Sequence, residues 1–412
     1  MIQTSSFSDD GTVAATLGVY RKAICPHFDS TVCQVSLTGR DGSIQSLTCE
    51  PMTRCLWMGL LVIVAMVGCV REPRTQPTPS PAEGRVLIEQ SLPAGIADRS
   101  GWVEDVYAAF SALEITPTAE KVCAVVAVTE QESGFQVDPV IPDLGKVAWR
   151  EIDRRAERAA IPPALVHEVL ALKSSTGQSY AERIEHARTE KELSDVFEDF
   201  TGSIPLGRTL FASWNPIRTR GPMQVNVAFA TSFAASHHYP YPVKESIADE
   251  VFTRRGSVYF GVAHLLDYSA PYNRYLYRFA DFNAGQYASR NAAFQRAVSL
   301  LSGLPLDCDG ALLPHESGAP GRTELAVRAV GGRLHLDDEA IHAALVQGKT
   351  PEFERTKLYR GVFALAERVQ GRPAPRAIVP QIELQGPKIS RKLTTEWYAQ
   401  RVDGRFKRCL AR

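Results

Sequence analysis

Residues 117–134 read PTAEKVCAVVAVTEQESG, an apolar run that ends in two glutamates. Thr116 and Pro117 form a helix-start signal, because a capping residue is followed by proline at the first helical position. Gly134 is a natural helix stop. Since the run between these signals is apolar on most sides, we expect a central, buried helix. The stretch therefore predicts a mainly α fold built around this helix.

The presence of two glutamates, Glu130 and Glu132, at the end of an apolar helix requires a physical explanation. A buried carboxylate is costly unless it is paired or kept protonated. The helix dipole at a C-terminal end disfavours a carboxylate, and apolar walls add a penalty of the same sign. Both effects raise the pKa of a glutamate, as an acid catalyst requires. The two side chains point about 160° apart and both continue apolar lines, so periodicity does not choose between them.

Composition excludes some function classes and leaves the size of the fold open. The chain has 412 residues, of which 44% are hydrophobic, enough for one large domain or two smaller ones. Lys plus Arg and Asp plus Glu both number 46, so the net charge is zero. This balance gives no electrostatic case for binding nucleic acid.

Helical periodicity predicts how the rest of the chain is organised. Ser100 is expected to cap a first helix, and residues 98–304 form the expected core domain, with a longer, polar helical insert at 136–220. Residues 305–412 are expected to form a helical C-terminal extension. One alternative concerns residues 327–336, where two glycines between β-favouring runs suggest a short hairpin.

Residues 52–68 are typical of a signal peptide. Arg54 precedes an apolar stretch that is too short to span a bilayer, which needs about 20 residues. The tetrapeptide that ends at Cys69 resembles a bacterial lipobox, which implies that Cys69 is lipidated and becomes the mature N-terminus. Residues 69–97 then form a Pro/Ser/Thr-rich tether. The alternative is a poorly formed signal anchor.

The lipobox implies a location. We expect a protein held by lipid on the outer membrane and facing the periplasm, because Val70 rather than Asp follows Cys69. A signal peptide belongs at an N-terminus, so we expect Met52 to be the true start and residues 1–51 to be a mis-annotated extension. The alternative is a genuine N-terminal extension.

The mature chain would keep four cysteines. Cys69 is the expected lipidation site, and Cys123 is expected to be a packed thiol in the apolar helix. We expect Cys308 and Cys409 to form a disulfide in the oxidising periplasm. No cysteine or histidine spacing is typical of zinc, so we expect no metal and no cofactor.

Three motifs follow one another in the order of a known family. Glu132-Ser133 ends the apolar helix, GPMQ lies at residues 221–224, and FNAG at 282–285 follows a helix that contains Gly261. This order resembles the lysozyme-like soluble lytic transglycosylases, which cleave the glycan strands of peptidoglycan. The alternative interpretation is an ordinary buried helix end with two unrelated turns.

The resemblance covers roughly residues 115–300 and implies a lysozyme-like core with one catalytic carboxylate. Glu132 would protonate the glycosidic oxygen and then, as a base, deprotonate the sugar's own 6-hydroxyl group. The product would be a 1,6-anhydro sugar, with help from the substrate's N-acetyl group in place of a second carboxylate. Glu130 would instead pair with a base or reach water.

The resemblance also assigns substrate-binding roles. Ser133 would support the cleft through a hydrogen bond, and Met223 and Gln224 would line it with backbone groups. Asn283 would hydrogen-bond the substrate, and Tyr287 would stack on a sugar face.

The sequence departs from the family pattern at several positions. Pro222 stands where Leu is usual and removes a backbone donor. Phe282 replaces a Tyr, Asp281 replaces a small residue and would bring charge to the cleft, and Ser257 replaces an Asn. The insert at 136–220 is longer than the usual linker and would cover or reshape the groove.

Two functions are compatible with these features. The first is a lipid-anchored enzyme whose partners are peptidoglycan and the membrane. The second is a non-catalytic outer-membrane lipoprotein that binds peptidoglycan or an envelope protein partner in assembly or uptake. The combination of lipobox, insert and helical tail resembles a family of uncharacterised outer-membrane lipoproteins built on this core.

Overall fold

A computed structural model describes the chain in two compact units, Met1–Pro77 and Thr78–Arg412. The described residues are 33–35 and 47–49 in the first unit, and 79–205, 215, 217–314, 319–384 and 392–412 in the second. In the first unit, β1 (Cys33–Val35) pairs antiparallel with β2 (Leu47–Cys49). The expected signal peptide and Cys69 lie outside the described residues.

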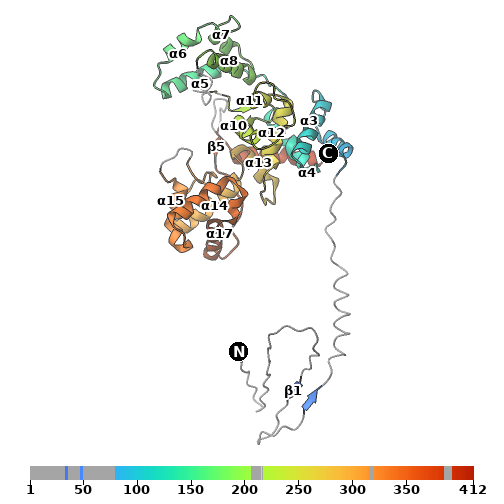
Figure 1. The fold of residues 1–412 in the computed structure, drawn as a ribbon, viewed down its shortest axis with the longest axis vertical. Coiled ribbons are helices and arrows are strands. Elements are labelled where there is room, and N and C mark those ends of the chain that lie inside the picture. Colours follow the sequence, from blue (N-terminus) through green and yellow to red (C-terminus); the bar gives the residue numbers. More distant parts are fainter. Residues whose placement is uncertain are drawn as a thin grey trace. The chain divides into compact units, whose positions relative to one another are not determined.

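The second unit is mainly helical, as the periodicity predicts, and its first core surrounds one buried helix (Figure 1). This helix, α4 (Ala119–Glu132), is buried from Val122 to Thr129, so the predicted central helix is confirmed. Its cap is Thr118 rather than Thr116, because the Thr118 side chain accepts a hydrogen bond from the Lys121 amide.

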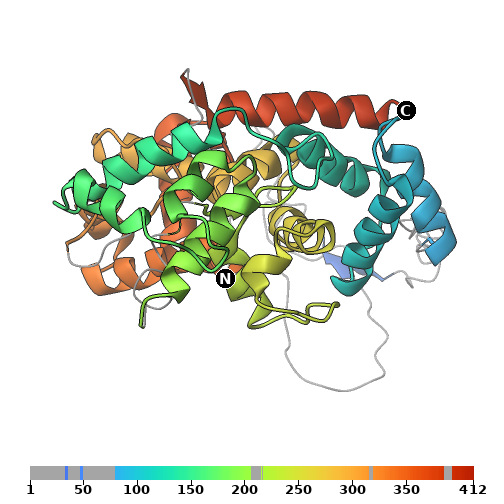
Figure 2. The same cartoon turned by 90° about the horizontal axis from the view of Figure 1, so that it is seen from above.

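Further helices contribute to this first core. They include α2 (Pro81–Ser91), α3 (Arg99–Ala112), α12 (Arg254–Leu266), α13 (Tyr275–Ala284) and α18 (Thr395–Leu410). Helix α2 lies within the range 69–97, so the expected tether is wrong for this part of the chain. The cap of α3 is Asp98 instead of Ser100, since the Asp98 carboxylate accepts from the Gly101 amide at 3.2 Å. In Figure 2, α18 is the long red helix, and it packs against α4 and α13.

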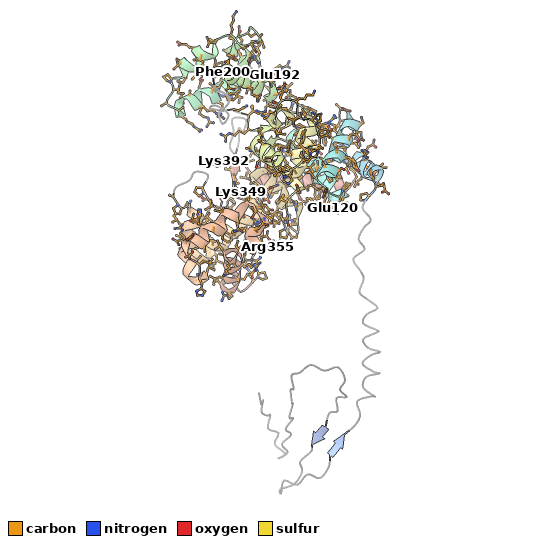
Figure 3. All side chains as sticks on the ribbon, in the orientation of Figure 1. Glu120, Glu192, Phe200, Lys349, Arg355 and Lys392 are labelled. Carbon is orange, nitrogen blue, oxygen red and sulfur yellow. A yellow bond between two sulfur atoms is a disulfide. The ribbon has the colours of Figure 1, made fainter. Side chains whose placement is uncertain are left out.

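The insert forms most of a second core, to which Phe252 also contributes. It contains α5 (Leu144–Arg158), α6 (Pro163–Leu170), α7 (Tyr180–His186) and α8 (Glu190–Gly202). Glu192 and Phe200, labelled in Figure 3, belong to α8. A capping box at Thr189 and Glu192 starts α8 and separates it from α7. The helices expected in this insert are therefore present.

A third core joins the end of the expected domain to the C-terminal region. It is built from α14 (Ala288–Ser302), α15 (Arg322–Leu334), α16 (Asp338–Val346) and α17 (Lys357–Gln370), with short 3₁₀ helices η2 (Gln347–Lys349) and η3 (Pro351–Arg355) between α16 and α17. The alternative hairpin at 327–336 is wrong, because α15 continues through both glycines.

The boundary expected near residue 305 does not separate two bodies. Helix α14 belongs to the third core, whereas α18 returns to the first core beside α4. Two strands lead into α18, since β5 (Glu383–Leu384) pairs antiparallel with β6 (Leu393–Thr394). The C-terminal helix is therefore part of the core and not of an extension.

The cysteine pairing differs from the expected one. Cys123 of α4 forms a disulfide with Cys409 of α18, with 5.5 Å between their Cα atoms. Cys308 is free and buried in the third core region, so the expected Cys308–Cys409 pair is wrong. The pairing follows from the packing of α18 on α4, which spacing in the sequence does not show. None of the helices within the described ranges is long and apolar enough to cross a membrane.

Candidate active site around Glu132

Glu132 is the last residue of α4 and is partly buried. Its Oε1 atom accepts a hydrogen bond from the Tyr398 hydroxyl of α18 at 2.5 Å. Burial raises the pKa of Glu132 to about 7, the Tyr398 bond lowers it, and the nearby charge of Glu190 raises it further. The direction of the shift agrees with the prediction, and desolvation is its largest cause.

Glu130 faces a different partner set. Its Oε1 atom lies 3.5 Å from Arg405 Nε and 3.8 Å from Arg408 Nη2, both on α18. The prediction that Glu130 pairs with a base is confirmed. The two glutamates therefore have separate environments, one among arginines and one beside a tyrosine hydroxyl.

The GPMQ turn lies between two short strands, β3 (Thr219–Arg220) and β4 (Val225–Asn226), followed by α10 (Val227–Ala234) and, further on, α11 (Ile247–Glu250). Gly221 has φ +70°, and a Cβ atom there would lie 2.1 Å from the Val251 carbonyl oxygen. Only glycine suits this position.

Met223 anchors the turn in the core. Its side chain is fully buried, and its amide donates to the Ser257 hydroxyl at 2.9 Å. A Cβ atom at Gly261 would lie 2.4 Å from Met223 Sδ, so α12 and the turn are in close contact. Met223 therefore does not line a cleft with its backbone, because Ser257 already occupies its amide. Ser257, which stands where the family pattern has Asn, therefore accepts the hydrogen bond that holds Met223.

Gln224 directs its side chain toward the insert. Its backbone has φ +49°. Its Oε1 atom accepts from Thr219 Oγ1 at 2.9 Å, and its Nε2 atom donates to Glu190 Oε2 at 3.0 Å. Glu190 is the first residue of α8 and is the group whose charge acts on Glu132. The structure thus brings together Glu132, Gln224, Glu190 and Tyr398.

Ser133 and Asn283 lie close to this group. The Ser133 hydroxyl donates to the Thr129 carbonyl at 3.3 Å, a bond within its own helix end. Asn283 is exposed near the end of α13, and its Oδ1 atom accepts from Thr395 Oγ1 at 2.8 Å. Thr395 lies one helical turn before Tyr398, so Asn283 lies beside the segment of α18 that contacts Glu132.

Tyr287 does not have the expected role. It is buried, its ring contacts Tyr268, and the Arg290 guanidinium lies 4.2 Å from its ring centroid. Both the burial and these contacts remove it as a platform for a sugar. Its left-handed φ of +66° starts α14.

Asp281 is also placed differently from the expectation. It is fully buried and accepts hydrogen bonds from the Tyr272 and Tyr268 hydroxyls and from the Tyr287 and Ser289 amides. Desolvation raises its pKa to about 6 despite these donors. Asp281 therefore holds the turn that follows Asn283 and brings no charge to a cleft.

The sequence analysis missed Tyr398 and Glu190. Tyr398 is 266 residues from its partner Glu132, and no local pattern shows that distance to be bridged. Cys409 lies on the same helix as Tyr398, and pairing it with Cys123 would have indicated that this helix packs against α4. Glu190 lies in the insert expected to be polar, and it is buried at the start of α8.

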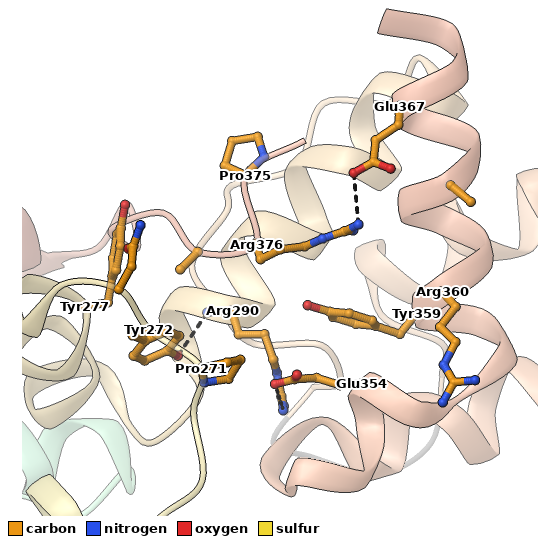
Figure 4. A pocket seen from close by; sticks show the side chains of 13 residues that line it. Pro271, Tyr272, Tyr277, Arg290, Glu354, Tyr359, Arg360, Glu367, Pro375 and Arg376 are labelled. Atoms are coloured by element: carbon orange, nitrogen blue, oxygen red, sulfur yellow. Dashed lines mark hydrogen bonds and ion pairs between the residues drawn. The ribbon is translucent and has the colours of Figure 1, made fainter. Parts of the chain in front are cut away.

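Two hollows lie in the second unit. One, of about 780 Å³, is lined by residues that include Trp102, Glu130 and Phe135. The other, of about 550 Å³, lies among Tyr272, Arg290 and α17 (Figure 4). Neither is lined by Glu132. Within the described part of the chain, no three His, Cys, Asp or Glu side chains gather in a way that would hold a metal ion.

Comparisons with known proteins place the chain in a family. Residues 95–412 match the family model described as "Protein of unknown function (DUF1615)". The chain is 46% identical over 358 residues to "Uncharacterized protein YaiW" of Escherichia coli (strain K12), which covers 86% of this chain and 97% of that relative. No solved structure matches the chain. The matched range runs through every helix from α3 to α18 and includes the whole group around Glu132, and the chain belongs to the DUF1615 family.

Proposed function

We propose that this protein cleaves the glycan strands of peptidoglycan, with Glu132 as the single acid and base. The observation that carries the proposal is the environment of Glu132, a partly buried carboxyl at a helix end whose pKa is raised to about 7. Glycoside cleavage near neutral pH needs an acid of this strength, and an ordinary glutamate is already ionised there.

The chemistry requires two proton transfers at one carboxyl group. Protonated Glu132 gives its proton to the glycosidic oxygen as the bond from that oxygen to C1 breaks. The resulting carboxylate then takes the proton of the 6-hydroxyl group while that oxygen bonds to C1, which closes a 1,6-anhydro ring. The Tyr398 hydroxyl, which donates to Glu132, stabilises the carboxylate between the two transfers.

Neighbouring groups suit substrate binding in this scheme. Exposed Asn283 provides an amide beside α18, and the Gln224 side chain links the GPMQ turn to Glu190. Met223 and Ser133 act on the site through the turn and the helix end that they hold. Peptidoglycan is the substrate that the order of these motifs favours.

The proposed location is the periplasmic face of the outer membrane, with a lipid on Cys69. The Cys123–Cys409 disulfide supports an oxidising compartment, in which such bonds persist. Replacement of Cys69 by Ser should abolish metabolic labelling with palmitate. Labelling that persists in this variant would contradict the anchor.

The cleavage proposal is tested with purified sacculi and the soluble chain from about Arg71. Mass spectrometry should find anhydro-muropeptides with the wild type and none with Glu132→Gln. Glu130→Gln is the matched control, because Glu130 lies at the same helix end but pairs with Arg405 and should retain activity. Release that is absent with the wild type, or unchanged in Glu132→Gln, would reject the enzymatic function.

A second candidate is a non-catalytic lipoprotein that binds glycan or an envelope partner. It is favoured by the two hollows described above, neither of which includes Glu132. It predicts that the wild type and Glu132→Gln bind sacculi equally and that neither releases fragments.

A further inference from the structure

The hollow of about 550 Å³ joins the first and third cores. The segment 271–277 and Arg290 form one side, while α17 and the segment 375–377 form the other. Figure 4 shows Tyr272 and Tyr277 on one side of this space and Tyr359 with Arg360 across from them. Its volume is in the range of sites that bind small molecules.

Aromatic rings supply flat surfaces in this hollow. The centroids of Tyr272 and Tyr277 are 5.7 Å apart with their planes tilted by 60°, and both side chains are partly exposed. The ring of Tyr359 lies on the opposite wall. Partly exposed tyrosines of this kind combine an apolar face with a polar edge, which suits a sugar ring.

In the described part of the chain, two of the arginines that line the hollow are held in ion pairs. Arg376 pairs with Glu367 at 2.9 Å, and Arg290 lies 3.5 Å from Glu354. Arg290 also donates to the Gly348 and Thr350 carbonyls, so its guanidinium is structural.

Arg360 differs from these two arginines. It is exposed on α17 and lines the hollow, and it forms no ion pair with any carboxylate in the described part of the chain. A guanidinium in this position suits a carboxylate on a bound molecule, because charge-assisted hydrogen bonds to arginine are strong and directional.

We propose that this hollow binds an amino sugar that carries a free carboxylate, such as the N-acetylmuramic acid unit of a glycan strand from which the stem peptides have been removed. The sugar ring lies against Tyr272 and Tyr277, and its carboxylate bonds Arg360. This inference rests on the proposed function, and it adds a second glycan contact outside the group around Glu132.

Hydrogen bonds of Asp281 and helix α13 link the wall of the hollow to the surroundings of Glu132. The Tyr272 hydroxyl donates to Asp281 at 2.7 Å, and Asp281 accepts from the Tyr287 amide at 3.0 Å. Asp281 therefore joins the wall of the hollow to the turn that follows Asn283. Helix α13 carries Tyr277 in the hollow and Asn283 beside α18. A strand bound in the hollow thus contacts the same helix that lies beside the site.

The test uses the soluble chain with N-acetylmuramic acid and, as the comparison, N-acetylglucosamine, which lacks the carboxylate. Binding is measured by calorimetry or by NMR titration. We expect N-acetylmuramic acid to bind more tightly, and Arg360→Gln to weaken its binding about tenfold or more by removing the charged donor. Arg368→Gln is the matched control, because Arg368 is also exposed on α17 but does not line the hollow.

The outcomes separate this inference from the cleavage proposal. Glu132→Gln should bind N-acetylmuramic acid like the wild type, and Arg360→Gln should keep the pH dependence of cleavage. No binding, equal binding of the two sugars, or equal affinity in Arg360→Gln and the wild type would overturn the inference. Loss of cleavage in Glu132→Gln is a separate result, which depends on the proposed acid alone.

Discussion

At the residue scale, the pKa of Glu132 results from opposing neighbours. Burial and the charge of Glu190 raise it, whereas the hydrogen bond from Tyr398 stabilises the carboxylate and lowers it. Because desolvation is the largest of these effects, the pKa is raised to about 7 and a substantial share of the carboxyl groups is protonated at neutral pH. The two neighbours can be removed one at a time.

Removing either neighbour should move the pKa of Glu132 in a known direction. Tyr398→Phe removes the donor, so the pKa should rise above about 7, and Glu190→Gln removes a negative charge, so it should fall. A ¹³C NMR titration of the glutamate carboxyl groups measures both shifts. Glu130→Gln serves as the control and should leave the titration of Glu132 in place. Shifts of the same sign in Tyr398→Phe and Glu190→Gln would contradict this environment.

The raised pKa also predicts how stability depends on pH. The folded state holds the Glu132 proton up to about pH 7, whereas the unfolded chain releases it near the ordinary glutamate pKa of 4.5. The folded state therefore binds more protons in this window, and the free energy of unfolding falls as the pH rises from about 4.5 to about 7.

Glu132→Gln should remove this contribution while keeping an acceptor for Tyr398. The free energy of unfolding of the variant, minus that of the wild type, should therefore be about 1 to 3 kcal/mol larger at pH 8 than at pH 5. Urea unfolding at the two pH values measures the difference. An unchanged difference between the two proteins across this range would contradict the raised pKa.

Sequence reasoning at this scale succeeded where the cause was local. The dipole and the apolar run predicted an acid at the end of α4, and the motif position, not the periodicity, selected Glu132 over Glu130. It failed for Tyr287, Tyr398 and the partner of Cys409, because their contacts depend on how distant helices pack. Side-chain exposure at a turn cannot be inferred from the turn motif.

At the element scale, the GPMQ turn depends on close contact with α12. A Cβ atom at Gly261 would lie 2.4 Å from Met223 Sδ, whereas one at Gly332 of α15 would meet nothing within 4 Å. The two glycines therefore form a matched pair, both in helices and with opposite surroundings.

Gly261→Ala should destabilise the protein by about 1 to 3 kcal/mol through overpacking. Gly332→Ala should stabilise it by about 0.5 to 1 kcal/mol, since alanine favours a helix over glycine. Thermal unfolding of the two variants measures the contrast. A tolerated Gly261→Ala would show that the turn is not held against α12.

The Cys123–Cys409 disulfide links α18, which carries Tyr398, to α4, which carries Glu132. Cys409→Ala should lower the free energy of unfolding by about 2 to 4 kcal/mol. The wild type and Cys308→Ala should lose stability on addition of reductant, and Cys409→Ala should show no further loss. Reductant sensitivity that disappears in Cys308→Ala instead would contradict the Cys123–Cys409 pair.

Elements with strong local signals were predicted well. The buried α4, the amphipathic helices of the insert and the helix breaks at Gly134 and near the FNAG turn follow from periodicity and capping. The hairpin at 327–336 was wrong because two adjacent glycines weaken a helix without ending it, and packing of α15 in the third core compensates.

At the scale of the whole molecule, the described residues form three helical cores, and α18, the last helix in the sequence, belongs to the first of them. The expected domain boundary at residue 305 is wrong because it follows a change in sequence pattern. Helices on both sides of that residue pack together in the third core, and α18 belongs to the first core. The third core and the first core together form the hollow proposed to bind a carboxylate-bearing sugar.

The most direct test of the central claim is the mass of the sugar end that the soluble chain leaves on purified glycan strands. We predict 1,6-anhydro ends with the wild type, fewer of them at pH 8 than at pH 6, and none with Glu132→Gln. The pH trend follows because the acid, with a pKa of about 7, is largely ionised at pH 8. Intact strands with the wild type, or the same anhydro ends with Glu132→Gln, would contradict the role of Glu132 as the acid of a glycan-cleaving enzyme.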